Sequence, residues 1–162
     1  MADLISVIVS TYNRADALDA VLRSLSTQTD RNFEIVVADD GSRPDTGEVV
    51  ARWRAGAGVQ VSHVWHEDQG FRLAEIRNRA ILASQGTYCI FLDGDCLAQP
   101  GFIAAHRAVA QPGWFVTGSR LLLSQALTVR VLADGLAADG FLHDCGGFPW
   151  MAMTGGIKDA RG

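Results

Sequence analysis

The sequence has little that would mark a membrane-spanning, secreted or disulfide-bonded protein. No apolar run approaches the roughly 18 residues that a bilayer span needs. The first residues also lack the basic and apolar parts of a signal peptide. The three cysteines are odd in number and show no Cys-x-x-Cys spacing, which is typical of reduced thiols. These absences predict a cytoplasmic protein without a transmembrane segment, or one peripheral to the inner face of the membrane.

Positive charge and phosphate-loop motifs are also scarce. The chain has 14 Lys plus Arg against 18 Asp plus Glu, a formal net charge of −4. With no basic field to attract a phosphate backbone, we expect no nucleic-acid partner. There is no G-x-x-x-x-G-K-[ST] loop, and the one approach to G-x-G-x-x-G, which begins at Gly56, has Val61 at the third glycine position. That substitution disfavours a dinucleotide site.

Hydrophobic residues alternate between strand-like and helix-like periodicity along the first 92 residues. The length of 162 residues and the 48% hydrophobic content suffice for one domain with a core. Short β-branched runs predict buried strands, and apolar residues at helical spacing predict helices. The expected strands are residues 4–10, 33–38, 59–66 and 88–92, and the expected helices are 15–29, 46–55 and 73–84. This order predicts an α/β fold with three layers, α/β/α, around a mostly parallel sheet.

The pattern weakens after residue 100. We expect a helix over residues 101–110 and a strand over 114–123 that Gly118 interrupts. From Gly135 onward seven of 28 residues are glycine, which predicts a loop or a poorly ordered tail. The chain therefore divides into a domain over residues 1–125 and an irregular, Gly-rich C-terminal segment over 126–162.

Polar residues follow each of the first four predicted strands. The strands run into Thr11-Tyr12-Asn13-Arg14, Asp39-Asp40-Gly41-Ser42, His66-Glu67-Asp68 and Asp93-Gly94-Asp95. The carboxyl ends of parallel strands meet at one edge of a sheet, and ligands bind there at the point where the strand order reverses. The sequence thus predicts one carboxylate-rich binding site built from all four strand ends.

Asp93-Gly94-Asp95 directly follows a buried strand. A tight glycine turn can aim the two carboxylates at one point, where a cation or a shared proton must lie between them. Hard oxygen ligands at an open site suit Mg²⁺ or Mn²⁺. A solvated turn is the alternative, and the buried strand before it together with the neighbouring acidic strand end favours the metal.

Two further features keep alternatives open. Asp39 and Asp40 either cap a turn, accept hydrogen bonds from a nucleobase or ribose, or act as phosphoacceptors. Arg77 lies at the buried edge of the predicted helix 73–84, where its guanidinium needs an acidic partner. That partner is either a protein carboxylate or a ligand phosphate.

Four motifs in this order resemble the family 2 glycosyltransferases of the GT-A fold. They span residues 5–14, 35–42, 77–80 and 91–95, and the resemblance covers residues 4 to about 123. The stretch over residues 69–78 is similar to the branch of chondroitin-polymerising and galactosyltransferase-like enzymes. The resemblance implies that residues 1–125 form a nucleotide-sugar-binding GT-A domain without the acceptor-binding second half.

The resemblance implies a metal-dependent transfer of a sugar, with inversion, from a nucleotide donor, usually UDP-linked, to a hydroxyl of a saccharide or glycoconjugate. Thr11 and Tyr12 would flank the uracil, Asp39 would accept its ring N–H, and Arg77 would lie near the nucleotide. Asp93 would face the ribose or the metal, and Asp95 would bind Mn²⁺ or Mg²⁺ directly. The implied nucleotide-binding residues are Thr11, Tyr12, Asn13, Arg14, Asp39, Asp40, Arg77 and Asp93.

The sequence identifies no general base. Members of the family place an acidic base in their second half, whereas no glutamate follows Glu75 here, and the late candidates are Asp134, Asp139, His143 and Asp144. Two alternatives follow. One is a non-catalytic nucleotide-sugar-binding fragment or subunit, completed by a second copy or another chain. The other is a phosphotransferase of the haloacid-dehalogenase type, which also uses D-x-D after a buried strand.

Overall fold

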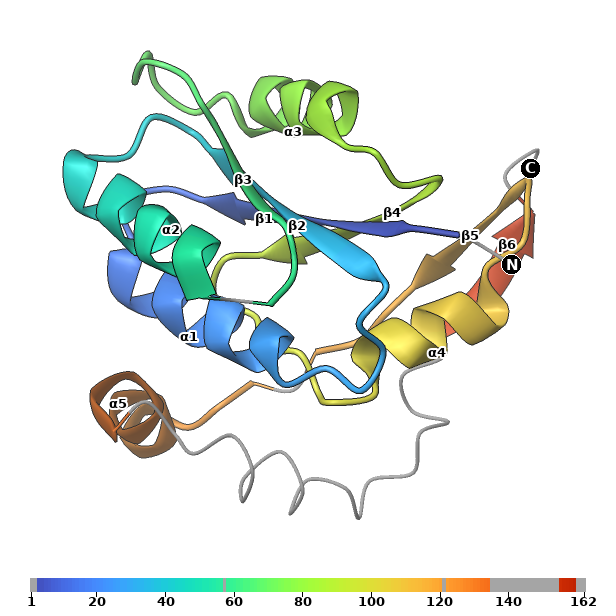
Figure 1. The fold of residues 1–162 in the computed structure, drawn as a ribbon. Coiled ribbons are helices and arrows are strands. Elements are labelled where there is room, and N and C mark those ends of the chain that lie inside the picture. Colours follow the sequence, from blue (N-terminus) through green and yellow to red (C-terminus); the bar gives the residue numbers. More distant parts are fainter. Residues whose placement is uncertain (1–2, 57, 121, 135–154, 160–162) are drawn as a thin grey trace.

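Four parallel strands form the central sheet in the computed structural model, in the order β3-β2-β1-β4 (Figure 1). The strands are β1 (Ile5–Thr11), β2 (Phe33–Asp39), β3 (Val61–Trp65) and β4 (Tyr88–Asp93). The structure describes residues 3–56, 58–120, 122–134 and 155–159, and only the backbone of residues 134 and 155–159. Because β2 and β4 lie on opposite sides of β1, the strand order reverses between β1 and β4, where ligands bind in such sheets.

Helices cover both faces of this sheet. Helices α1 (Ala15–Ser26) and α2 (Pro44–Gly56) pack on one face, and α3 (Leu73–Ala83) packs on the other (Figure 1). The observed layers and strand directions confirm the predicted three-layer α/β fold. Among the described helices, none combines the length and apolar character that crossing a membrane requires.

The core follows from the period-2 alternation of β1 and β2, which are buried along their whole length. Alternate residues of a strand point to opposite faces of the sheet, so each strand supplies both helix layers. Odd-numbered apolar residues of β1 and β2 pack with α1, whereas Ile8, Val36 and Ala38 pack with Ile76 and Ala80 of α3. Continuous apolar runs are therefore required here, as is typical of parallel sheets.

The elements after β4 depart from the prediction. Helix α4 (Phe102–Val109) forms as expected, but β5 (Trp114–Thr117) ends well before residue 123. It pairs antiparallel with β6 (Gly155–Asp159), from Trp114 opposite Asp159 to Thr117 opposite Gly155. The predicted strand over 114–123 is wrong for the described residues beyond Thr117, and β5 ends directly before Gly118, the residue expected to interrupt it.

Helix α5 (Gln125–Asp134) lies in a segment that the prediction left irregular. Its start has a recognisable signal, since the Ser124 hydroxyl accepts the Leu127 N–H at 3.3 Å, as an N-cap serine does. Helix α5 contacts α1, and its Val131 is buried. The expectation of an irregular segment is thus wrong for α5 and for β6. Residues 135–154 and 160–162 of the predicted tail lie outside the described residues, and the boundary at residue 125 stays a prediction.

A buried carboxylate holds the start of β4 in place. Glu34, in β2, is 1% exposed, and its Oε1 accepts the Ser6 hydroxyl at 2.7 Å and the Gly86 N–H at 3.3 Å. The Gln85 N–H donates to the same oxygen. Because β4 begins directly after this turn, Glu34 fixes the position from which β4 runs to Asp93.

Replacing Glu34 with alanine is expected to lower the free energy of unfolding by about 3 kcal/mol, because three donors lose a charged acceptor in a buried place. Urea unfolding followed by circular dichroism measures the loss. Glu48→Ala, at an exposed position of α2, is the matched control, with an expected change below about 0.5 kcal/mol. Equal effects of the two variants would show that Glu34 is not a structural anchor.

Candidate functional site

The carboxyl ends of β1, β2 and β4 lie next to one another. Thr11 at the end of β1 is opposite Asp39 of β2, and Ser10 is opposite Asp93 of β4. The loops beyond the strands are also bonded together, since the Asp40 N–H donates to the Thr11 carbonyl at 3.0 Å. The structure therefore brings the predicted strand-end residues into one site.

The Asp93-Gly94-Asp95 turn closes tightly against β1. The Gly94 N–H donates to the Ser10 carbonyl at 2.7 Å, and a Cβ on Gly94 would lie 2.7 Å from that same oxygen. Such a contact is far too short for any side chain. Glycine at this position lets the turn hold Asp93 and Asp95 beside the end of β1.

Asp93 forms ion pairs with two guanidinium groups. Its Oδ1 lies 2.8 Å from Arg77 Nη2, and its Oδ2 lies 3.4 Å from Arg120 Nη1. Arg77 comes from α3 and is held a second time by the Ser10 hydroxyl, 2.9 Å from its Nε. The sequence left two possible partners for Arg77, a protein carboxylate and a ligand phosphate. In the structure the partner is a protein carboxylate, that of Asp93.

Asp95 is exposed, and no ion pair to it is found among the residues that the structure describes. Asp93, Asp95 and Cys96 can each place one ligand atom within 4.8 Å of the others, the one such group in the described part of the chain. Burial, and then the nearby Asp95 charge, raise the pKa of the Cys96 thiol, and a thiol is a softer ligand than the oxygens that Mn²⁺ or Mg²⁺ prefers. The two carboxylates fit a hard divalent cation such as Mn²⁺ or Mg²⁺, with Asp95 as the more available ligand.

Asp39 is buried at the end of β2, with 1% exposure. Its Oδ1 accepts the Ser42 N–H at 2.8 Å, and its Oδ2 lies 2.9 Å from His63 Nε2. Both carboxylate oxygens of Asp39 therefore have protein partners, and the hydrogen bond from Ser42 stabilises the turn after β2. A nucleobase N–H at Asp39 would have to share one of these oxygens.

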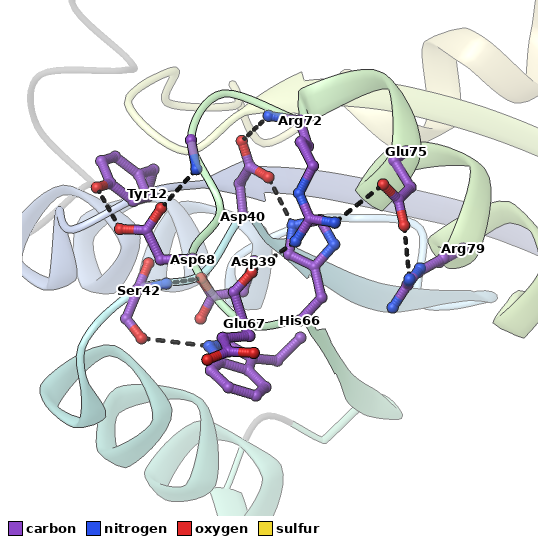
Figure 2. A network of polar contacts seen from close by, with 12 residues as sticks. Tyr12, Asp39, Asp40, Ser42, His66, Glu67, Asp68, Arg72, Glu75 and Arg79 are labelled. Atoms are coloured by element: carbon purple, nitrogen blue, oxygen red, sulfur yellow. Dashed lines mark hydrogen bonds and ion pairs between the residues drawn. The ribbon is translucent and has the colours of Figure 1, made fainter.

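Asp40 joins two elements that are distant in the sequence. Its Oδ1 lies 2.6 Å from His66 Nε2, and its Oδ2 accepts the Arg72 N–H at 2.9 Å (Figure 2). His66 follows β3, and Arg72 directly precedes α3. Because Asp40 binds both ends of the segment 66–72, it fixes this loop over the turn after β2 and sets where α3 begins. The expected approach of His66 to the site is confirmed.

The same loop also contacts Tyr12. The Tyr12 hydroxyl donates to Asp68 Oδ2 at 2.9 Å, while the Gly70 N–H donates to Asp68 Oδ1 at 3.0 Å (Figure 2). The Gly70 N–H and then the Tyr12 hydroxyl hold the pKa of Asp68 below its usual value. Gly41 has φ +91°, and a Cβ there would lie 2.6 Å from the Asp68 Cα, so the loop packs directly on the glycine.

The remaining residues of the β1 loop have different surroundings. Asn13 has a positive φ of 50°, and its N–H donates to the Ser42 hydroxyl at 2.9 Å. The Thr11 hydroxyl is buried without a hydrogen-bond partner among the described residues. Arg14 forms an exposed ion pair with Asp16 at 3.0 Å. Asn13 thus helps to shape the site, while Arg14 has a local partner.

Sequence reasoning missed Arg120 and the partners of Asp39 and Asp40. Arg120 was placed inside a strand over 114–123, whereas β5 ends at Thr117 and the chain then returns to Asp93. The histidine pairings follow from the neighbouring positions of β2 and β3 in the sheet, which the sequence does not state. Asp139, His143 and Asp144 lie outside the described residues, as does the side chain of Asp134, so no general base is assigned.

Comparison with known proteins relates this fold to one family of transferases. The family Glycosyl transferase family 2 matches residues 6–136. A validoxylamine A glucosyltransferase of Streptomyces hygroscopicus subsp. jinggangensis is 38% identical over 113 residues, which are 66% of this chain and 26% of that protein. A chondroitin synthase of Escherichia coli is 31% identical over 105 residues, which are 64% of this chain and 15% of that protein. The chain thus spans about a quarter or less of the length of these relatives.

Solved structures agree with the sequence comparison. The mannosyltransferase PcManGT of Pyrobaculum calidifontis, solved with GDP-Man and Mn²⁺, has a TM-score of 0.62 at 26% identity and covers 81% of this chain and 39% of its own. S. aureus TarS 1-349 in complex with UDP-GlcNAc has a TM-score of 0.55 at 30% identity, over 64% of this chain and 30% of its own. The family match decides against the haloacid-dehalogenase-type alternative. With this fold, these strand ends and a match over residues 6–136, the chain belongs to glycosyltransferase family 2 and has the GT-A fold.

Proposed function

We propose that the chain binds a nucleotide sugar for an inverting, metal-dependent glycosyl transfer to a saccharide or glycoconjugate hydroxyl. The observation that carries the proposal is the meeting of two acidic turns, one after β2 and one after β4, at the end of β1. This is the switch point of the sheet, where nucleotides bind in such folds. A UDP-linked donor is the form we expect.

The acidic turn after β4 suits the diphosphate end of the donor. Asp95 would hold Mn²⁺ or Mg²⁺, with Asp93 as the second oxygen ligand, and the cation would stabilise the negative charge of the leaving nucleoside diphosphate. Arg77 binds Asp93 at 2.8 Å and keeps that carboxylate oriented. PcManGT was solved with GDP-Man and Mn²⁺, which supports a divalent cation.

The loop after β1 suits the nucleoside end of the donor. Tyr12 is 50% exposed while its hydroxyl is fixed by Asp68, so its ring would be held in place where a nucleobase could stack on it. Thr11, Asp39 and Asp40 lie around the same turn. TarS was solved with UDP-GlcNAc and PcManGT with GDP-Man, which supports a nucleotide-sugar ligand, and UDP remains the form expected from the sequence motifs.

The transfer itself would form a bond from the acceptor oxygen to the anomeric carbon and break the bond from that carbon to the diphosphate. The acceptor hydroxyl proton would pass to a base that lies outside the residues described here. The acceptor site and this base would come from residues other than the described ones, of this chain, of a second copy or of a completing partner. A cytoplasmic location, with or without a peripheral contact with the membrane, fits a soluble nucleotide-sugar donor.

Isothermal titration of the protein with UDP and with GDP, in the presence and absence of MnCl₂, tests the proposal. We expect UDP binding that weakens at least about tenfold when the metal is removed, because the diphosphate then loses its counter-charge. The same affinity with and without metal would contradict the metal assignment, and no binding of either nucleotide would contradict the donor site. Release of sugar from UDP-sugars by the isolated chain would exclude a purely non-catalytic module.

A further inference from the structure

Arg120 reaches the acidic turn from a segment that belongs to none of the central strands. It follows β5 by three residues, and its Nη1 lies 3.4 Å from Asp93 Oδ2. The side chain is 69% exposed. Arg120 is thus a solvent-facing cation at the rim of the proposed metal site, where it makes a long ion pair with Asp93 and also interacts with the Cys96 thiol.

Arg77 and Arg120 differ although both face Asp93. Arg77 is 29% exposed, makes the shorter 2.8 Å contact, donates to Ser10 and lies over the Phe91 ring at 6.0 Å. That guanidinium is fixed by the fold and suffices as the partner of one carboxylate. Arg120 adds a second positive charge in an exposed position, where an ion pair contributes little to stability and the side chain is free to exchange partners.

Charge balance indicates what that partner would be. The charges of Asp93, Asp95, Arg77 and Arg120 cancel, so a divalent cation bound at the two carboxylates leaves the cluster positive. An anionic diphosphate beside the cation restores neutrality. A planar guanidinium matches phosphate oxygens in two parallel hydrogen bonds, and cation binding at Asp93 weakens the competing attraction between Asp93 and Arg120.

We propose that Arg120 binds the diphosphate of the nucleotide donor, moving from Asp93 to the phosphate oxygens when the metal and the nucleotide bind. This inference rests on the proposed function. It adds Arg120 as a residue whose positive charge would stabilise the negative charge of the leaving nucleoside diphosphate. Arg77 stays on Asp93 and maintains the ligand geometry. The two arginines therefore have separate roles.

The test compares Arg120→Ala and Arg120→Lys with Arg52→Ala in the intact protein. Arg52 is a matched control on α2, since its side chain is 67% exposed and its ion pair to Asp19 measures 3.3 Å. Isothermal titration with MnCl₂ present measures the affinities for UDP and GDP, and for uridine and guanosine, which lack the diphosphate. A separate titration measures Mn²⁺ alone, and thermal unfolding verifies that each variant is folded.

We expect Arg120→Ala to weaken UDP or GDP binding about tenfold or more, the value of a lost hydrogen bond to a charged group. Binding of the nucleosides and of Mn²⁺ alone should stay within twofold, Arg120→Lys should recover part of the loss, and Arg52→Ala should match the wild type. Unchanged nucleotide affinity in Arg120→Ala, or an equal loss for Mn²⁺ alone, would overturn the assignment while leaving the donor site standing. A folded wild type that binds neither nucleotide would overturn the proposed function, and the role of Arg120 with it.

Discussion

Replacing Asp95 with asparagine is expected to weaken Mn²⁺ binding about 100-fold and to remove the metal-dependent part of nucleotide binding. Asp95 is exposed and lies within reach of Asp93, whose own oxygens face Arg77 and Arg120. Most of the free negative charge at the site therefore belongs to Asp95, and the affinity of a hard cation depends on ligand charge. Titration of Mn²⁺, followed by the loss of the free-ion signal in electron paramagnetic resonance, measures the change.

Glu48→Gln is the control for this experiment because it removes one negative charge from an exposed position of α2. It should leave Mn²⁺ and UDP binding unchanged, which separates a ligand effect from a change of net charge. Asp95→Asn should also unfold at the wild-type urea concentration, since an exposed side chain whose one hydrogen bond among the described residues is a 3.6 Å contact from the Cys96 thiol contributes little to stability. Wild-type Mn²⁺ affinity in Asp95→Asn would show that the acidic turn is not the metal site.

Replacing Asp40 with alanine is expected to destabilise the fold by about 3 kcal/mol or more. Asp40 is 4% exposed and binds both His66 and the Arg72 N–H, so its removal leaves two buried groups without their acceptor. The segment 66–72 would also lose its attachment to the turn after β2. Urea unfolding measures the stability, and faster amide hydrogen exchange at residues 66–72 would localise the effect.

Asp16→Ala is the matched control for Asp40, because Asp16 also pairs with a basic residue, but at the surface. Its contact with Arg14 is 3.0 Å long, with both side chains 53% exposed, and such pairs contribute at most about 1 kcal/mol. A loss of that size for both variants would mean that Asp40 is not the link between β3, α3 and the turn. Because both variants remove an aspartate that pairs with a basic residue, the difference between their unfolding free energies measures the effect of burying that pair.

Local pattern predicted the first four strands and three helices well. β1 and β2 are mostly apolar because both of their faces are covered, and this burial is what the sequence pattern reports. The same reasoning failed after β4. β5 ends at Thr117 and pairs with β6, a segment far along the chain, and α5 forms where Ser124 caps it and Val131 is buried. These boundaries depend on partners elsewhere in the chain, which no local window contains.

The site shows the same division. The residue types at the strand ends were enough to predict an acidic edge, because parallel strands must bring their carboxyl ends together. The partners of those residues were not predictable. Asp39 pairs with His63 and Asp40 with His66 because β3 lies beside β2, and Arg120 reaches Asp93 because the chain turns back after β5.

By itself, then, the sequence determined the alternation of strands and helices, the negative net charge, and the chemistry available at one edge of the sheet. These are properties of composition and of short-range periodicity. The tertiary structure decided which carboxylates are occupied and which are available. Asp39 and Asp40 are buried with protein partners, while Asp95 is exposed. The physical reason is that burial and pairing depend on contacts between residues far apart in the chain, and those contacts exist only once the sheet and its helices have packed.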